Sequence, residues 1–142
     1  MNATHRPSNA EIVGSLYQAF GAGDIAHILD QLTDDIAWDA DWTANSAQLA
    51  GIAHMAARKG PAEVAEFFAL LADWTFHDFT VLDVIGGGGQ VVAEIRVDVT
   101  LPGGARITDD ELHLWSFDEN GKVTRFRHYA DTAKHIAAYT GR

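Results

Sequence analysis

Two histidines and a glutamate in the last third of the chain are the residues whose types and spacing could do chemistry. Glu111 and His113 alternate along one predicted strand, so their side chains point to the same face of a sheet. His128 falls on the next predicted strand, close across from Glu111. A neighbouring carboxylate favours the imidazolium and burial disfavours it, so such a histidine can titrate near neutrality. The pattern indicates a general acid or base oriented by Glu111.

Two other roles remain open for these three side chains. In a purely structural role they form a buried, hydrogen-bonded cluster that fixes the sheet. In a metal site they form a set of two histidines and one carboxylate. The seven histidines of the sequence show no H-x-x-x-H or H-E-x-x-H spacing, so only this set of three side chains offers a metal site. In the structural alternative, the acidic run 109–111 is a solvated strand end. We expect Asp39 and Asp41 to be solvated.

Aromatic side chains form the second candidate group. They are either ordinary core residues or the wall of an apolar ligand pocket, in which the hydroxyl group of Tyr17 would be a polar contact. The residues that we expect to line such a pocket are Trp38, Trp42, Phe68, Trp115 and Phe126.

Helices are expected mainly in the first half of the chain. Ser8 and Glu11 form a capping-box pattern for a first helix that ends at 21–23. Asp24 predicts a second helix, Pro61 opens a third, and Asp131 caps a short final one. Between them, 36–42 alternates like a strand, whereas 43–59 lacks periodicity and is expected to be a loop with room for a helical turn.

From residue 74 onward the apolar pattern repeats every two residues. We expect strands at 74–85, 90–101, 106–117 and 122–130, joined by hairpin turns into an antiparallel meander. Separate blocks of helices and strands indicate an α+β fold. The expected architecture is one domain, 1–142, in which a curved antiparallel sheet wraps around three helices and leaves an internal pocket.

Composition excludes several classes of function. The 142 residues include no cysteine, which excludes disulfide scaffolds, thiolate metal sites and a cysteine nucleophile. A formal charge of −10 argues against binding to nucleic acid or to anionic membranes. No apolar run is long enough to span a membrane, and segment 1–7 lacks the apolar core of a signal peptide. We therefore expect a cytoplasmic protein.

Five segments resemble the SnoaL-like polyketide cyclases and ketosteroid isomerases. They are GDI at 23–25, LTDDIAW at 32–38, GPAEVAEFF at 60–68, ELHLWSFDENGKV at 111–123 and RHYAD at 127–131. The resemblance covers nearly the whole chain. It implies the cone-shaped fold of the nuclear-transport-factor type, also called cystatin-like, and it implies that the strand face of His113 lines the cavity. Because proteins of this fold catalyse different reactions or none, the resemblance implies no single activity.

The residues of ketosteroid isomerases are not retained. Their helix tyrosine corresponds to Leu16, next to Tyr17, their general-base aspartate to Ala40, and their second pocket aspartate to His113. We therefore reject steroid isomerisation by that mechanism.

The function implied is cofactor-free acid–base chemistry, by cyclisation, isomerisation or dehydration, on a small apolar carbonyl compound. The resemblance also implies no metal, because proteins of this superfamily seldom use one. His113 would be the base or acid, His128 its partner, Glu111 the orienting group and Tyr17 a donor. The alternative is a ligand-binding or dimerisation module without catalysis. In either case we expect a homodimer through the outer face of the sheet, with Trp74, Leu114 and Tyr129 among its apolar residues.

Overall fold

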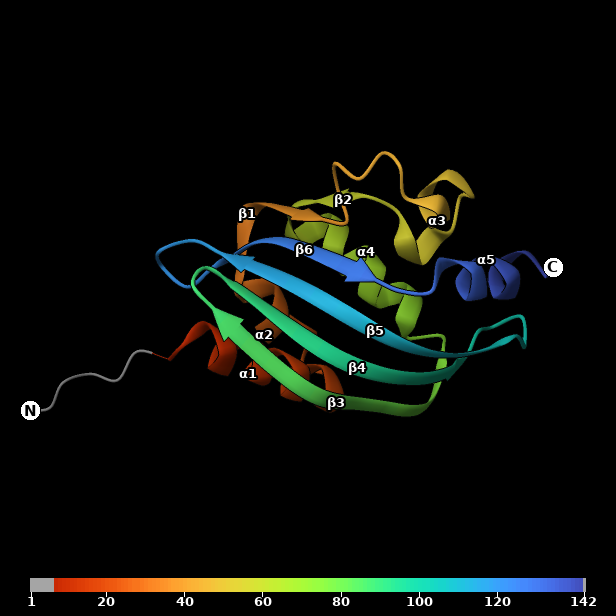
Figure 1. Cartoon of the computed structure of the whole chain (residues 1–142), viewed down its shortest axis with the longest axis horizontal. Helices are drawn as coiled ribbons and strands as arrows, with labels where there is room; N and C mark the ends of the chain where they lie inside the picture. Colours follow the sequence, from red (N-terminus) through yellow and green to blue (C-terminus); the bar gives the residue numbers. More distant parts are fainter. Residues whose placement is uncertain (1–6, 142) are drawn as a thin grey trace, which may run out of the picture.

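A single curved sheet and the helices on one of its faces make up the computed structural model, which describes residues 7–141 (Figure 1). The strands are β1 (Leu32–Trp38), β2 (Arg58–Lys59), β3 (Thr75–Gly87), β4 (Gln90–Thr100), β5 (Arg106–Phe117) and β6 (Val123–Tyr129). The helices are α1 (Asn9–Ala22), α2 (Ile25–Asp30), α3 (Ser46–Leu49), α4 (Gly60–Leu71) and α5 (Thr132–Thr140), with a 3-10 turn η1 (Ala53–Met55). The α+β prediction is confirmed. Segment 1–6, on which most of the signal-peptide argument rests, lies outside the described residues.

Local signals in the sequence set the helix ends. Ser8 and Glu11 form the reciprocal capping box, and Gly23 ends α1 in the left-handed conformation at φ 74°. The side chains of Asp24 and Asp131 cap α2 and α5. None of the helices within 7–141 has both the length and the apolar character needed to cross a membrane.

The sheet has the strand order β2-β1-β6-β5-β4-β3. Strands β3 to β6 form the expected antiparallel meander, whereas β1 joins it in parallel with β6. Side chains alternate between buried and exposed along β4 and β5, and the buried ones pack with α1, α2 and α4 in the main core. The apolar core and the concave face of the sheet therefore coincide.

The first strand lies four residues earlier than predicted. It was expected at 36–42 but covers Leu32–Trp38. Asp39 and Asp41 adopt left-handed backbone conformations, with φ of 49° and 57°, and such residues cannot continue a strand. The chain therefore leaves the sheet after Trp38, and Trp42 lies in the following loop.

The segment expected to be a loop, 43–59, has short ordered elements. Asn45 caps α3 with two hydrogen bonds from backbone N–H groups, η1 follows, and β2 pairs with β1. Ala47, Ile52 and Met55 form a second small core that packs against Ile136 of α5. Small residues without periodicity gave no signal for these contacts because the packing partner lies about 80 positions away in the sequence.

Candidate functional site

A cavity of about 80 Å³ lies between the helices and the concave face of the sheet. A single water molecule needs roughly 10–15 Å³, so the cavity is several times larger than one water requires. Its wall is mainly aromatic and aliphatic. The aromatic and polar residues that line it are Tyr17, Phe20, Trp38, His54, Phe67, Phe68, Trp74, Phe76, Phe79, Glu111, His113, Trp115, Phe126, His128 and His135.

The expected pocket residues divide into those that line this cavity and one that does not. Trp38, Phe68, Trp115 and Phe126 line it. Trp42 does not, because the chain has already left the sheet; its ring packs against Tyr129 and under the guanidinium group of Arg127.

The residues that line the cavity differ in exposure. Trp74 was expected on the outer face of the sheet, but it precedes β3 and lines the cavity. It is only partly buried, like Phe79, and Phe76 is 36% exposed. Glu111, His113 and His128, by contrast, are all buried.

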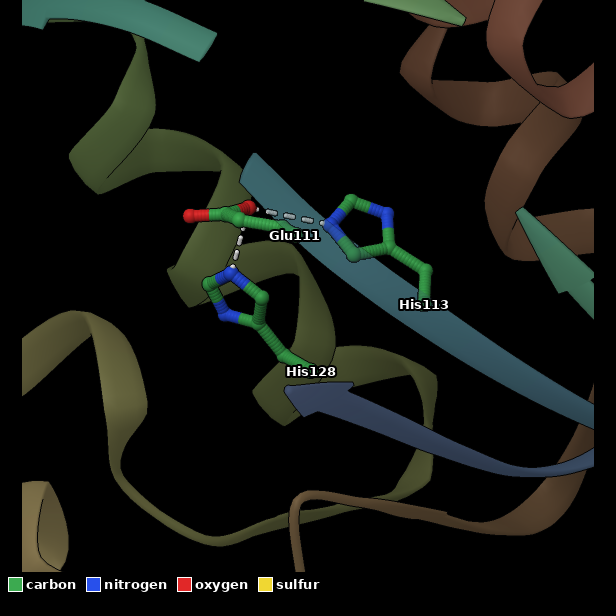
Figure 2. A group of neighbouring side chains, drawn as sticks. All are labelled: Glu111, His113 and His128. Carbon is green, nitrogen blue, oxygen red and sulfur yellow. Dashed lines mark hydrogen bonds and ion pairs between the residues drawn. The ribbon is translucent and has the colours of Figure 1, made fainter. Parts of the chain in front are cut away.

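The carboxyl group of Glu111 is within hydrogen-bond distance of both histidines predicted from the sequence. Its Oε1 atom lies 3.1 Å from Nε2 of His113 and 2.7 Å from Nε2 of His128 (Figure 2). Both imidazole rings point toward the same carboxyl group from neighbouring strands. The register differs from expectation, because His128 stands opposite His113 and reaches Glu111 diagonally.

Tyr17 extends this cluster into the helical layer. Its hydroxyl group lies 2.6 Å from Nδ1 of His113 and 3.1 Å from Nε1 of Trp115. Because an indole N–H can only donate, the tyrosine oxygen accepts from Trp115 and its own proton goes to His113. The neutral His113 ring then carries its proton on Nε2 and donates it to Glu111. The hydrogen bonds thus run in one direction from Trp115 to Glu111.

Three further ionisable side chains were missed by the sequence analysis. His135 of α5 places Nε2 2.9 Å from Oδ2 of Asp109 and 3.2 Å from Oε2 of Glu111. Its Nδ1 lies 2.9 Å from Nε2 of His54. Asp109 is 6% exposed, so the interpretation of the run 109–111 as a solvated strand end was wrong. Its alternation with Glu111 was a signal for an inward side chain, but nothing local indicated His54 or His135.

The charges of the cluster follow from its contacts. Burial alone would raise the pKa of Glu111, but the attraction of His128 and the hydrogen bonds from three imidazoles hold it well below its usual range. Burial lowers the pKa of His113 despite the bond to Glu111. For His128, the charge of Glu111 outweighs burial and raises the pKa. The cluster therefore combines a carboxylate, a neutral imidazole and a readily protonated one.

The pKa values of His135 and His54 are shifted in opposite directions. Burial would lower the pKa of His135, but its hydrogen bonds to Asp109 and Glu111 raise it to about 9. Burial, together with the nearby positive charge of His135, lowers the pKa of His54 to about 3. At neutral pH His135 is thus a cation that donates to a neutral His54.

The position of Asp39 differs from the prediction that its side chain is solvated. It was expected in solvent but is 1% exposed, and its Oδ1 accepts the backbone N–H of His128 at 2.8 Å. Its Oδ2 atom has no hydrogen-bond partner within residues 7–141, and burial raises the pKa of the carboxyl group to about 6. Asp41, by contrast, has a side chain that is 75% exposed, as expected.

Two groups of ligand atoms could hold a metal ion. One is Glu111 with His113 and His128, and the other is Asp109 with Glu111 and His135. Each contains nitrogen and oxygen donors of the kind that bind divalent metals. In both groups the same atoms also satisfy one another as donors and acceptors of hydrogen bonds, so the geometry is complete without an ion.

Comparison with known proteins gives the family. Residues 13–126 match the family model of the SnoaL-like domain. An NTF2-like protein of unknown function from Burkholderia pseudomallei is 25% identical, with a TM-score of 0.75 over 94% of this chain and 99% of that one. A candidate SnoaL-like polyketide cyclase from Mesorhizobium loti is also 25% identical, with a TM-score of 0.65 over 87% and 99%.

A third solved structure shares the fold. TerC, crystallised with polyporic acid, is 24% identical, with a TM-score of 0.73 over 93% of this chain and 98% of its own. No curated protein matches the chain in a sequence comparison. With most of its length matched by the family model and its fold shared with NTF2-like proteins, the chain belongs to the SnoaL-like family.

Proposed function

We propose that this protein binds a small, mostly apolar carbonyl compound in the cavity and moves a proton on it without a cofactor. The observation that carries the proposal is the hydrogen-bonded chain of Tyr17, His113 and Glu111, all three of which line a mainly apolar cavity. A base and a donor that touch each other are suited to remove a proton next to a carbonyl group and to hold the resulting enolate.

The directions of the hydrogen bonds suggest how the proton would move. The Tyr17 O–H group would donate its hydrogen bond to a carbonyl oxygen in the cavity instead of to His113. The lone pair on Nδ1 of His113 then becomes free. That nitrogen accepts the proton from the adjacent carbon, and the C–H electron pair becomes the enolate. Trp115 keeps donating to the tyrosine oxygen, while Glu111 stabilises the imidazolium through Nε2. Return of the proton from His113 to another carbon completes an isomerisation. In a cyclisation the enolate carbon instead attacks a second carbonyl carbon, and the oxygen of that carbonyl takes the proton from His113.

Family membership supports this reading without fixing the reaction. The Mesorhizobium loti relative is described as a candidate polyketide cyclase, which is consistent with chemistry on carbonyl compounds. A ligand-binding module without catalysis is the second candidate. It is favoured by the fact that neutral His113 already has a partner on each ring nitrogen.

The experiment is a comparison of His113→Gln with the matched control His77→Gln. A thermal-shift screen of aromatic and polycyclic ketones first identifies a ligand, and turnover is then followed by mass spectrometry. The glutamine amide can still donate and accept, so the fold should survive. We expect turnover to fall by roughly 10²–10⁴-fold. The control alters an exposed side chain bonded to Thr100, which does not line the cavity, and should have no effect.

The two candidate functions give different outcomes. Undiminished turnover in folded His113→Gln would remove His113 from the mechanism. Saturable binding of ketones with no chemical change in any of them would favour the binding module.

A further inference from the structure

Trp38 carries a polar group that the proposed proton transfer does not use. We propose that its indole N–H is a second hydrogen-bond donor to the ligand, so that the compound bound in the cavity carries a second acceptor oxygen besides the carbonyl group at Tyr17. The inference rests on the proposed function for the position of the first carbonyl group. It narrows the substrate class to small, mostly apolar compounds with two oxygen functions.

The indole N–H of Trp38 is buried and unpaired. The residue is 2% exposed, and its Nε1 atom has no hydrogen-bond partner within residues 7–141. An indole N–H can only donate, and leaving a buried donor unpaired costs free energy. Buried tryptophans usually find a partner for this group, so the missing acceptor needs an explanation.

The side chains around Trp38 explain why the protein itself supplies no acceptor. The indole stacks on Phe126, with ring centroids 3.9 Å apart. The ring centroids of Phe67 and Phe68 lie 5.4 and 5.8 Å from that of Trp38, and phenylalanine has no polar side-chain atom. Trp115 lies at 5.9 Å, but its own N–H is a donor too. All of these rings line the cavity, as Trp38 does, so the acceptor is expected to belong to the molecule that the cavity binds.

The two donors belong to neighbouring parts of the cavity wall. Tyr17 and Trp38 both contact Trp115 edge to face, and in each pair the ring centroids are 5.9 Å apart. A compound of two fused rings can therefore present one oxygen to the Tyr17 hydroxyl group and another to the Trp38 indole.

An unpaired donor in a binding site selects among ligands. A ligand without the second oxygen excludes water from the cavity and leaves the Trp38 N–H without any acceptor, which costs free energy. A site that is built to bond a polar group of its substrate rejects analogues that lack the group for this reason. The arrangement therefore favours compounds with two oxygens over compounds of the same size with one.

The test compares ketones that share one carbon skeleton and differ by one oxygen. Calorimetry measures the Kd of 1-decalone and of the isomeric decalindiones, which place the second carbonyl group at different positions. We expect one of the diones to bind about tenfold more tightly than 1-decalone, although its extra carbonyl group has to be removed from water. Trp38→Phe should abolish this preference. The matched control Trp42→Phe removes an N–H from a ring outside the cavity and should retain it. The absence of a preference for any dione, or a preference that survives in folded Trp38→Phe, would overturn the inference.

A measurement on the unmodified protein keeps the inference open to refutation if Trp38→Phe does not fold. The four tryptophans of the sequence give separate indole ¹H–¹⁵N signals, and that of Trp38 is assigned through its contact with the ring of Phe126. Saturation with the preferred dione should move the Trp38 indole proton downfield, as a new hydrogen bond does, and 1-decalone should move it less. A Trp38 signal that responds equally to both ketones would contradict the inference.

The outcomes separate this inference from the proposed function. Preferred binding of a dione without chemical change would support the inference and count against proton transfer. Equal affinity for 1-decalone and the diones, with turnover of both, would support the proposed function and overturn the inference. Binding of none of these ketones would count against both.

Discussion

Removing the hydroxyl group of Tyr17 gives the most direct test of the hydrogen-bonded chain. Tyr17→Phe leaves the ring and its contacts with Phe79 and Trp115 in place. It takes away the acceptor of the Trp115 indole N–H and the donor to His113, which are 3.1 and 2.6 Å from the tyrosine oxygen. Both remaining groups belong to buried residues. The substitution therefore isolates the energetic value of two hydrogen bonds from that of packing.

The expected cost follows from those two unpaired groups. Leaving a buried donor or acceptor without a partner costs about 1–3 kcal/mol each. A water molecule in the adjoining cavity can replace part of the loss, so we expect the free energy of unfolding to fall by about 2–3 kcal/mol. For a chain of this length that corresponds to a decrease in Tm of roughly 5–10 °C.

Urea unfolding followed by tryptophan fluorescence measures the difference. The control is Tyr129→Phe, which deletes the same atom from a side chain that is 41% exposed and should change stability by less than about 0.5 kcal/mol. If Tyr17→Phe is as stable as that control, the hydroxyl group is not held between Trp115 and His113, and the assignment of proton positions fails.

Three further predictions concern pH, the cavity and assembly. His54 stays neutral in the folded protein because its pKa is lowered to about 3, so stability should fall as the pH drops below about 6.5. The pKa of His135 is raised to about 9, so its contribution is complete below about 6.5 and is lost as the pH rises to 9. Unfolding at pH 5, 6.5 and 8.5 should show a maximum at the middle value, and the alkaline loss should be smaller in His135→Gln, where only the raised pKa of His128 still contributes to it. Trp42→Ala should leave the affinity for a cavity ligand within about twofold by calorimetry, because Trp42 packs on Tyr129 outside the cavity, and a tenfold loss would contradict the placement. Light scattering should report twice the chain mass, since Leu112 and Tyr129 leave apolar surface on the outer face of the sheet, and a monomer at micromolar concentration would contradict this.

The order of the elements could be predicted because its signals are local. Ser8 with Glu11, Asp24, Pro61 and Asp131 mark helix starts through contacts within three or four residues. The alternation along 106–117 places Glu111, His113 and Trp115 on one face whatever the strand pairs with. The direct partners Glu111, His113 and His128 were found from the sequence for the same reason, because hairpin strands are neighbours in both sequence and space.

Tertiary structure alone decided the parts that depend on distant packing. The left-handed backbone at Asp39 and Asp41 ends β1 and turns Asp39 inward, where its carboxyl group receives the N–H of His128. Segment 43–59 folds because Ile136 of α5 completes its small core. Neither effect has a local signature, since each requires a partner more than 80 positions away in the chain.

The cluster around Glu111 shows the same division. Glu111 and His113 stand two positions apart on one strand, so their contact follows from the pleat of the sheet. Which of the seven histidines would join them depended on where α5 and η1 pack, because His135 and His54 come from elements that give no sign of their direction in the chain. The direction of the hydrogen bonds also depends on tertiary structure, since it follows from the contacts of Tyr17 with Trp115 and His113, which exist only when α1 packs against the sheet.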